Sequence, residues 1–218
     1  EDLLSYTTAI VRVYNLHGRR DNKYKARIKI LVHEMGAEEL SRQVEVEFAS
    51  LRDTELKLPE ADVAAISAYF APPELSPRAE GWASLAHWKK ADADFARWVH
   101  QNVQPHKHPD YGMVTISLKP IGGIPGDATD GQMEAVADIA EEYAFDEIRV
   151  SHEQTLILPH VALADLEPVY RGLAAAGLAT ANAGLITDII ACPGLDYCAL
   201  ANARSIPVAQ EISTRFGA

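Results

Sequence analysis

The sequence predicts an α+β fold, and three patterns lead to that prediction. Residues 6–70 place apolar side chains at helical spacing, as Ile28, Leu31 and Met35 do. From Tyr111 onward the spacing changes to the alternation of a half-buried strand. Patterns typical of a helix, two short strands and a second helix then follow in that order. The length of 218 residues is enough for one large domain or two small ones with a substantial core.

The N-terminal part is predicted to be helical because each of its apolar stripes recurs every three or four residues. We expect helices over residues 6–16, 22–35, 37–48 and 59–70. A proline-rich linker with the sequence APPELSPRAEG follows and ends at Gly81. We place a boundary in this linker, so residues 1–80 form a helical segment. A further short helix is expected over residues 91–102.

The second half is predicted to form a small sheet with helices. Thr129 begins a helix, with Gln132 at the spacing of a capping box. The other expected elements are a strand from Tyr111, a hairpin of strands at 147–151 and 155–161, a helix ended by Gly177, and a final strand at 185–191. Strands and helices in this order form a split β-α-β, ferredoxin-like unit. We therefore assign residues 81–190 to a ferredoxin-like domain and 191–218 to the truncated start of a different domain.

Charge and cysteine content restrict the classes of function. The formal net charge of −11 argues against general binding of nucleic acid or anionic membranes. The stretch from His17 to Lys29 is an exception, because basic side chains outnumber its one acid, Asp21, and they indicate a local anionic ligand. The chain has two cysteines, too few for a disulfide framework. We expect a cytoplasmic protein without a membrane span.

Cys192 and Cys198 form a C-x5-C pair in the segment ACPGLDYCALANARS. Residues from Ala199 onward are predicted to begin a helix, whose N-terminus would favour a thiolate. Thiolates are the ligands of iron–sulfur clusters, which need four of them. Two reduced, buried core cysteines remain an alternative, since free cysteine is often buried. Zinc is a weaker alternative, because no nearby His or Cys completes four ligands.

Three segments together resemble the nitrite and sulfite reductases that contain sirohaem and a [4Fe-4S] cluster. The segment DIIACPGLDYCALANARSIPVAQEI resembles the opening of their iron–sulfur domain, where a C-x5-C pair precedes a C-x3-C pair. The segment 111–178, including DEIRVSHEQTLILPHV, resembles their ferredoxin-like half-domain. The segment YNLHGRRDNKYKARIKILV resembles the basic stretch that closes the first half of these enzymes. The resemblance implies an oxidoreductase that reduces sulfite to sulfide, or nitrite to ammonia, by six electrons.

The resemblance also implies cofactor sites. Cys192 and Cys198 would be two metal ligands of the cluster. Sirohaem carries many carboxylates, which basic side chains bind through charge-assisted hydrogen bonds. The candidates for that role are Arg19, Arg20, Asn22, Lys23, Lys25, Arg27 and Lys29. A solvated basic surface is the alternative for each of them.

Arg149 and Gln154 occupy the place of the family's R-x-T-x-x-Q pattern, with Ser151 in place of the Thr. They are interpreted either as structural residues or as the lining of a second copy of the cofactor site. His106 and His108, in a loop flanked by prolines, are interpreted as structural or exposed rather than as metal ligands.

The sequence lacks the C-x3-C pair, so we expect a fragment that by itself is inactive and holds neither sirohaem nor cluster. Catalytic residues cannot be assigned from it. The expected partners of the parent enzyme are sulfite or nitrite and an electron donor, either ferredoxin or a flavoprotein. A face exposed by truncation would favour dimerisation. The competing hypothesis is a non-catalytic ferredoxin-like module for binding or regulation, with structural cysteines.

Overall fold

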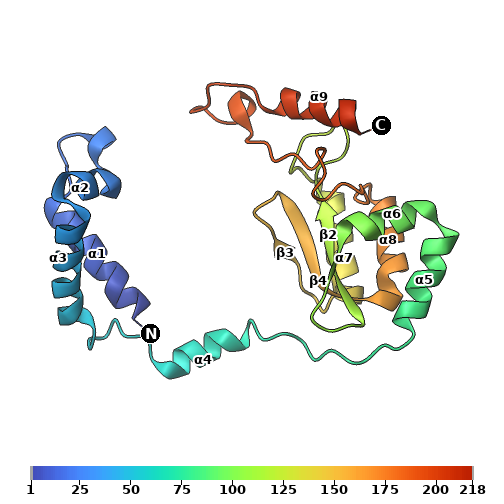
Figure 1. Ribbon diagram of the computed structural model, residues 1–218, viewed down its shortest axis with the longest axis horizontal. Coiled ribbons are helices and arrows are strands. Elements are labelled where there is room, and N and C mark those ends of the chain that lie inside the picture. The colour runs from blue at the N-terminus through green and yellow to red at the C-terminus, as the bar shows by residue number, and fades with distance from the viewer. Residues whose placement is uncertain (1, 218) are drawn as a thin grey trace. The chain divides into compact units, whose positions relative to one another are not determined.

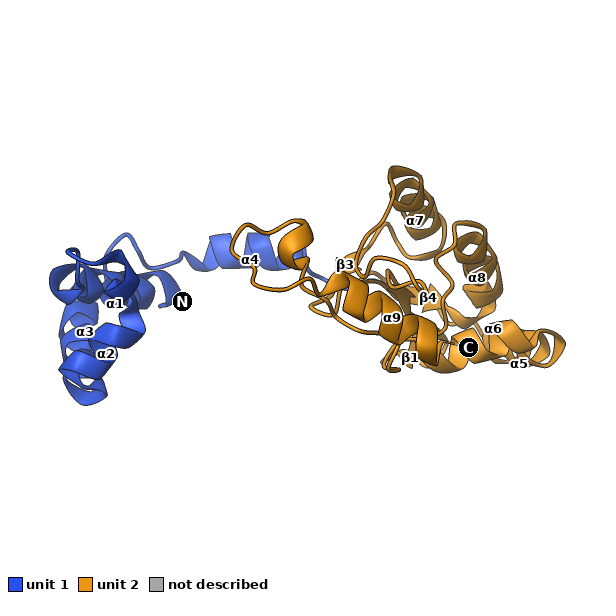
Figure 2. Ribbon diagram, turned by 90° about the horizontal axis from the view of Figure 1, so that it is seen from above, with its two compact units in different colours: residues 1–72 blue, residues 73–218 orange. Residues whose placement is uncertain are grey.

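The computed structural model describes residues 2–217, and the chain divides into two compact units, 1–72 and 73–218 (Figures 1 and 2). The linker between them, residues 71–78, forms neither helix nor strand. The boundary therefore falls beside the proline-rich segment, where few apolar side chains are available for packing. No helix within residues 2–217 is both long enough and apolar enough to cross a membrane.

The first unit is helical. Its elements are α1 (Leu3–His17), a 3₁₀ turn (Lys23–Lys25), α2 (Ile28–Met35), α3 (Ala37–Leu51) and α4 (Glu60–Ala68). Its small core joins Ala9 and Val13 of α1 to Val44 and Leu51 of α3. The helix predicted over 22–35 is wrong in its first part, because Asn22 caps the 3₁₀ turn and the backbone is extended at Arg27. Regular helix begins only at Ile28.

The second unit contains the sheet and its covering helices. The helices are α5 (Gly81–Ala91), α6 (Ala93–Asn102), α7 (Asp130–Tyr143), α8 (Leu166–Ala175) and α9 (Ile206–Phe216). The strands are β1 (Val103–Pro105), β2 (Tyr111–Ser117), β3 (Arg149–Val150) and β4 (Thr155–Ala162). They form an antiparallel sheet in the order β1-β2-β4-β3. This mixture of helices and a small antiparallel sheet is the predicted α+β, ferredoxin-like architecture.

The core lies between one face of the sheet and helices α6, α7 and α8. Alternate side chains of the central strands enter it, including Val114 and Ile116 of β2 and Leu158 of β4, all three fully buried. Trp98 of α6 is buried in the same cluster, with its ring centroid 5.3 Å from that of Tyr170 on α8. The two central strands are therefore fixed in register by the side chains that face the helices.

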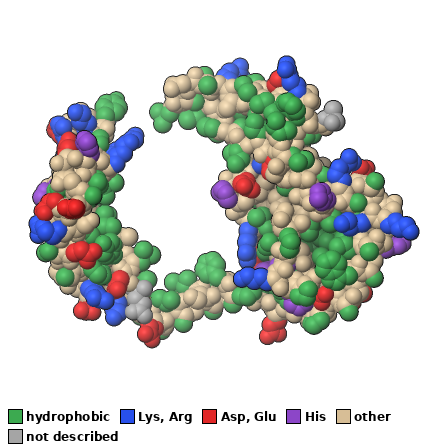
Figure 3. All heavy atoms as spheres, viewed as in Figure 1, with side chains coloured by type: hydrophobic (Ala, Val, Ile, Leu, Met, Phe, Trp, Pro, Cys, Tyr) green, Lys and Arg blue, Asp and Glu red, His purple; other side chains and the backbone are tan. Residues whose placement is uncertain are grey.

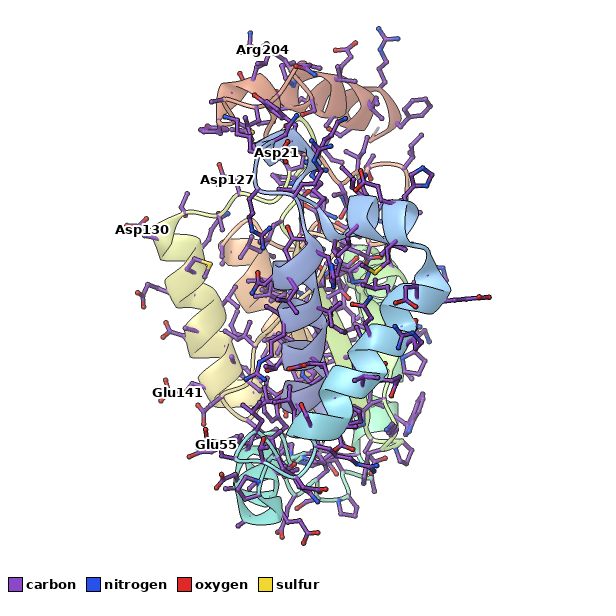
Figure 4. The ribbon with its side chains drawn as sticks, turned by 90° about the vertical axis from the view of Figure 1, so that its left-hand side faces the viewer. Asp21, Glu55, Asp127, Asp130, Glu141 and Arg204 are labelled. Atoms are coloured by element: carbon purple, nitrogen blue, oxygen red, sulfur yellow. The ribbon has the colours of Figure 1, made fainter. Side chains whose placement is uncertain are left out.

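The capping box predicted at the start of α7 is present. The Thr129 hydroxyl accepts a hydrogen bond from the Gln132 amide, and the Gln132 side chain accepts one from the Thr129 amide. Figure 4 labels Asp127 and Asp130 on either side of this cap, and Glu141 near the other end of α7. The cap fixes the point at which the chain leaves the loop after β2 and enters the helix.

The final strand predicted at 185–191 is wrong. Residues 185–191 form turns and irregular backbone. The edge of β2 that a last strand would use is already occupied by β1, which pairs through Val103↔Val114 and Gln104↔Met113. The sheet thus has an edge strand from the segment before β2 instead of from the segment after α8.

Candidate functional site

The two cysteines lie on the loop that directly precedes α9, residues 192–205, which we call the cysteine loop (Figure 1). Cys192 is exposed and Cys198 is half-buried, and both thiols are free. A 3₁₀ turn (Gly194–Asp196) separates them. The structure therefore excludes the alternative of two fully buried core cysteines.

The cysteine loop is closed by contacts between its two ends. The Leu195 amide donates to the Ala203 carbonyl at 3.0 Å, and the Ser205 hydroxyl donates to the Cys192 carbonyl. Arg204, labelled in Figure 4 beside α9, forms an ion pair of 2.5 Å with Asp196. Both thiols are thus carried by a closed loop whose backbone conformation is restricted.

Gly194 makes the tight turn after the first thiol possible. Its φ of +61° lies in the left-handed region, and a Cβ there would be 2.6 Å from the Ala203 carbonyl oxygen. The Gly194 carbonyl accepts a hydrogen bond from the Cys198 amide at 2.8 Å. A side chain at position 194 would therefore displace the second cysteine as well as strain the backbone.

The prediction that a helix begins at Ala199 is wrong. Residues 199–205 form turns and bends, and α9 begins only at Ile206, after Ser205. Neither thiol therefore lies at the N-terminus of a helix, and a helix dipole does not favour its thiolate. Arg204 of ANARS instead helps to close the loop, because its guanidinium turns back toward Asp196.

The segment that leads into Cys192 is anchored to the sheet by side chains that the sequence analysis left out. Lys119 and Asp188 form a buried ion pair, their side chains 1% and 8% exposed. The Lys119 ammonium also donates to the Glu153 carbonyl at 2.5 Å. Asn182, also buried, donates to the Lys119 carbonyl at 3.0 Å. Nothing in the sequence indicates that Lys119, two residues after the end of β2, is buried. The tertiary structure alone reveals this anchor.

The donor set of the cysteine loop fits half of an iron–sulfur site. Two thiolates on one loop are ligands of the correct kind, because cubane clusters are held by cysteine thiolates. In the described part of the chain, no group of three or more His, Cys, Asp or Glu side chains is arranged to hold a metal ion. The loop alone can therefore supply two of the four ligands that such a cluster requires.

The seven basic-stretch candidates lie in the first unit, six of them between α1 and α2 and the seventh, Lys29, in the first turn of α2. Four of them already have local partners. Arg19 forms a 2.5 Å ion pair with Asp21, and Arg20 donates to Asn15 at 2.8 Å. Asn22 accepts the Tyr24 amide as a cap, and the Lys23 ammonium lies 5.2 Å from the Tyr24 ring centroid.

Lys25, Arg27 and Lys29 form no ion pair with any side chain within residues 2–217. The helix expected over residues 22–35 includes all three, but Lys25 ends the 3₁₀ turn and Arg27 is the N-cap of α2. Only Lys29 belongs to the helix. These three cations are thus the members of the basic stretch that remain available for an anionic ligand.

The fold and the cysteine loop define a class of protein in which a ferredoxin-like half-domain is followed by a loop with two free cysteines. Two family models match the chain. The nitrite/sulfite reductase ferredoxin-like half domain matches residues 105–176, and the nitrite and sulphite reductase 4Fe-4S domain matches residues 1–50. Together these matches cover more than half of the chain, while residues 191–218 lie outside both. The chain belongs to the nitrite/sulfite reductase family.

Individual relatives agree with the family models. The chain is 25% identical to the chloroplastic ferredoxin–nitrite reductase of Zea mays, with 99% of this chain and 33% of that protein aligned. It is 28% identical to sulfite reductase [ferredoxin] 2 of Mycolicibacterium paratuberculosis, over 90% of this chain and 29% of the relative. The chain thus spans about a third of the length of these proteins.

A solved structure supports the fold. The Mycobacterium tuberculosis NirA protein superposes with a TM-score of 0.61 at 23% identity, over 97% of this chain and 32% of that one. At this level of identity the likeness concerns the fold. It covers nearly the whole chain, so both units resemble parts of one larger protein.

Proposed function

We propose that this chain is part of a reductase that uses sirohaem and a [4Fe-4S] cluster to reduce sulfite to sulfide or nitrite to ammonia with six electrons. Cys192 and Cys198 serve as two of the four cluster ligands. The observation that carries this proposal is the cysteine loop. It presents two free thiols, one exposed and one half-buried, directly after a ferredoxin-like half-domain of the nitrite/sulfite reductase family.

The remaining cluster ligands come from residues outside this sequence. This follows from the ligand count, since the described residues supply two thiolates and a cubane requires four ligands. The cofactors, when bound, supply electron transfer to the oxyanion, and the protein supplies ligation and orientation. The contacts of Ser205 with Cys192 and of Gly194 with Cys198 hold the loop backbone, so the thiols require little rearrangement on binding.

The basic stretch is proposed to bind the carboxylates of sirohaem, with Lys25, Arg27 and Lys29 as its principal members. These cations are free of ion pairs within residues 2–217 and therefore keep their donors available. Arg19, Arg20, Asn22 and Lys23 would support them, because their local contacts with Asp21, Asn15 and Tyr24 hold the segment in place. Charge-assisted hydrogen bonds to carboxylates are the interactions that arginine and lysine supply to such a ligand.

We propose ferredoxin as the electron donor, because the named relatives from Zea mays and Mycolicibacterium paratuberculosis are both described as ferredoxin-dependent reductases. One of them reduces nitrite and the other sulfite, at 25% and 28% identity. Both oxyanions therefore belong in any assay. A flavoprotein donor would be recognised by activity with a reduced flavoprotein and none with ferredoxin.

The test uses the intact protein from which this sequence derives, purified with its cofactors. Cys192→Ser and Cys198→Ser should each abolish the visible absorption of the cluster and the reduction of both oxyanions, because a serine hydroxyl is a poor substitute for a thiolate. Ala199→Ser, an exposed change in the same loop, is the matched control and should retain both. An unsubstituted protein without iron or sirohaem would contradict the proposal and favour the non-catalytic module.

A further inference from the structure

We propose that Gln154 is a positioning residue, which holds the backbone of Ala191 and thereby fixes the direction in which Cys192 is presented. This inference rests on the proposed function of Cys192 as a cluster ligand. It assigns a specific task to a glutamine in the turn between β3 and β4, well separated in sequence from the cysteine loop.

The contact consists of two hydrogen bonds to one residue. The Gln154 side-chain amide donates to the Ala191 carbonyl at 2.9 Å, and the Ala191 amide donates to the Gln154 side-chain oxygen at 3.0 Å. Ala191 is 7% exposed. Both backbone polar groups of the residue before Cys192 are thus paired with one side chain, in an arrangement resembling a pair of bonds between strands.

The backbone at Gln154 adopts a conformation that is unusual for a glutamine. Its φ of +55° lies in the left-handed region, which glycine and asparagine adopt more readily than glutamine. The facing loop also makes room for it. A Cβ on Gly126, itself at φ +83°, would lie 3.2 Å from Cβ and Cδ of Gln154. A strained glutamine opposite a glycine is explained by the two bonds that its amide makes.

Other contacts hold the residues on either side of Gln154 and Ala191. Loss of the Gln154 contact should therefore change the backbone only at the residue directly before Cys192. The buried Lys119 ammonium binds the carbonyl of Glu153 and the carboxylate of Asp188, which lie one residue before Gln154 and three residues before Ala191. On the other side, the Ser205 hydroxyl binds the Cys192 carbonyl. Cys192 is therefore held from both sides, and within residues 2–217 the hydrogen bonds to Ala191, directly before it, come from Gln154.

Gln154→Asn removes the contact while keeping the backbone conformation. Asparagine suits a left-handed backbone, but its side chain is one methylene too short to reach Ala191. In the 218-residue chain, we expect the Ala191 amide to exchange with solvent about ten- to hundredfold faster, since two hydrogen bonds are lost. The thermal unfolding temperature should fall by only a few degrees, because the relief of backbone strain at position 154 partly offsets the lost hydrogen bonds. Gln104→Asn, the same change at an exposed position of β1, is the matched control and should alter neither quantity.

The same substitutions in the intact protein then test the link to the cluster by iron content. Gln154→Asn should lower iron incorporation, whereas Gln104→Asn should not. Unchanged exchange at Ala191 would overturn the contact itself, and faster exchange with normal iron content would overturn its role in positioning Cys192. Absence of iron from the unsubstituted intact protein would overturn the proposed function of the cysteines, and with it this role, whatever the exchange rates.

Discussion

At the scale of single residues, the histidines near β1 form an ordered chain of hydrogen bonds. The His108 amide donates to Nδ1 of His106 at 2.8 Å, so His106 carries its proton on Nε2. That nitrogen lies 3.0 Å from Nδ1 of the buried His160, which therefore accepts. Nε2 of His160 then carries the proton and faces a Glu147 carboxylate oxygen at 3.4 Å. The histidines are structural, as the sequence predicted for His106 and His108.

The chain of histidines makes stability depend on pH. Burial lowers the pKa of His160, and this effect outweighs Glu147, which raises it, while His106 and Arg149 lower it further. The unfolded chain therefore binds a proton more readily than the folded one. The free energy of unfolding should fall as pH drops below the ordinary histidine value of about 6.5 toward the lowered pKa.

His160→Asn should weaken that decline between pH 7 and pH 5, because the titrating group is gone while an oxygen can still accept from His106. Urea unfolding at a series of pH values measures the effect. His152→Asn is the control, since the His152 side chain is 93% exposed. An equally steep decline in both variants would show that other groups cause the acid sensitivity.

At the scale of elements, the side chain of Gln132 links the beginning of α7 to the end of α8 by hydrogen bonds. Its side-chain oxygen completes the capping box, and its side-chain nitrogen donates to the Ala176 carbonyl at 3.0 Å, just after α8. One glutamine thus serves the beginning of one helix and the end of another. The capping box was visible in the sequence, but the bond to Ala176 required the two helices to be packed side by side.

Thr129→Ala should destabilise the protein by about 1 kcal/mol, because the Gln132 amide loses its capping oxygen. Thermal unfolding followed by circular dichroism is a suitable measurement. Thr129→Ser keeps the oxygen and should lie close to the unsubstituted protein. Equal losses in the serine and alanine variants would assign the effect to the lost methyl group instead of the cap.

At the scale of the whole molecule, the chain consists of two units with separate cores. Ala9, Val13, Val44 and Leu51 form the core of the first unit. The chain just before the linker is easily reached from solvent, since Tyr69 and Phe70 are 87% and 80% exposed. Figure 3 shows further hydrophobic side chains at the surface along α9 and its adjoining loop. The predicted dimerisation through an exposed face stays a prediction.

Brief digestion with chymotrypsin should cut after Tyr69 or Phe70 and release a fragment that contains the second unit. We expect this fragment to unfold cooperatively, because the sheet and helices α6, α7 and α8 share one core. The double variant Tyr69→Ser, Phe70→Ser should resist cleavage at this place. A released fragment that lacks a cooperative transition would show that the second unit depends on the first.

Much of the fold could be predicted because local patterns determine it. The apolar stripes predicted most helices, and the alternation of Val114 and Ile116 predicted the central strand. Two of the errors share one cause, which is that contacts with residues outside the predicted element decided the outcome. The strand expected at 185–191 would pair with the edge of β2, which β1 already occupies. The helix expected from Ala199 is replaced by a loop closed through Ser205 and Arg204.

The sequence by itself determined the family and the candidate ligands, because motif spacing and residue type are local properties. It placed Cys192 and Cys198 in a C-x5-C pair and identified the basic stretch. Only the tertiary structure showed that Gln154 binds Ala191, and that Lys119 is buried against Asp188. These contacts join residues more than thirty positions apart, and no pattern along the chain specifies which distant groups will meet. The geometry of the cysteine loop therefore depends on the packing of the whole second unit.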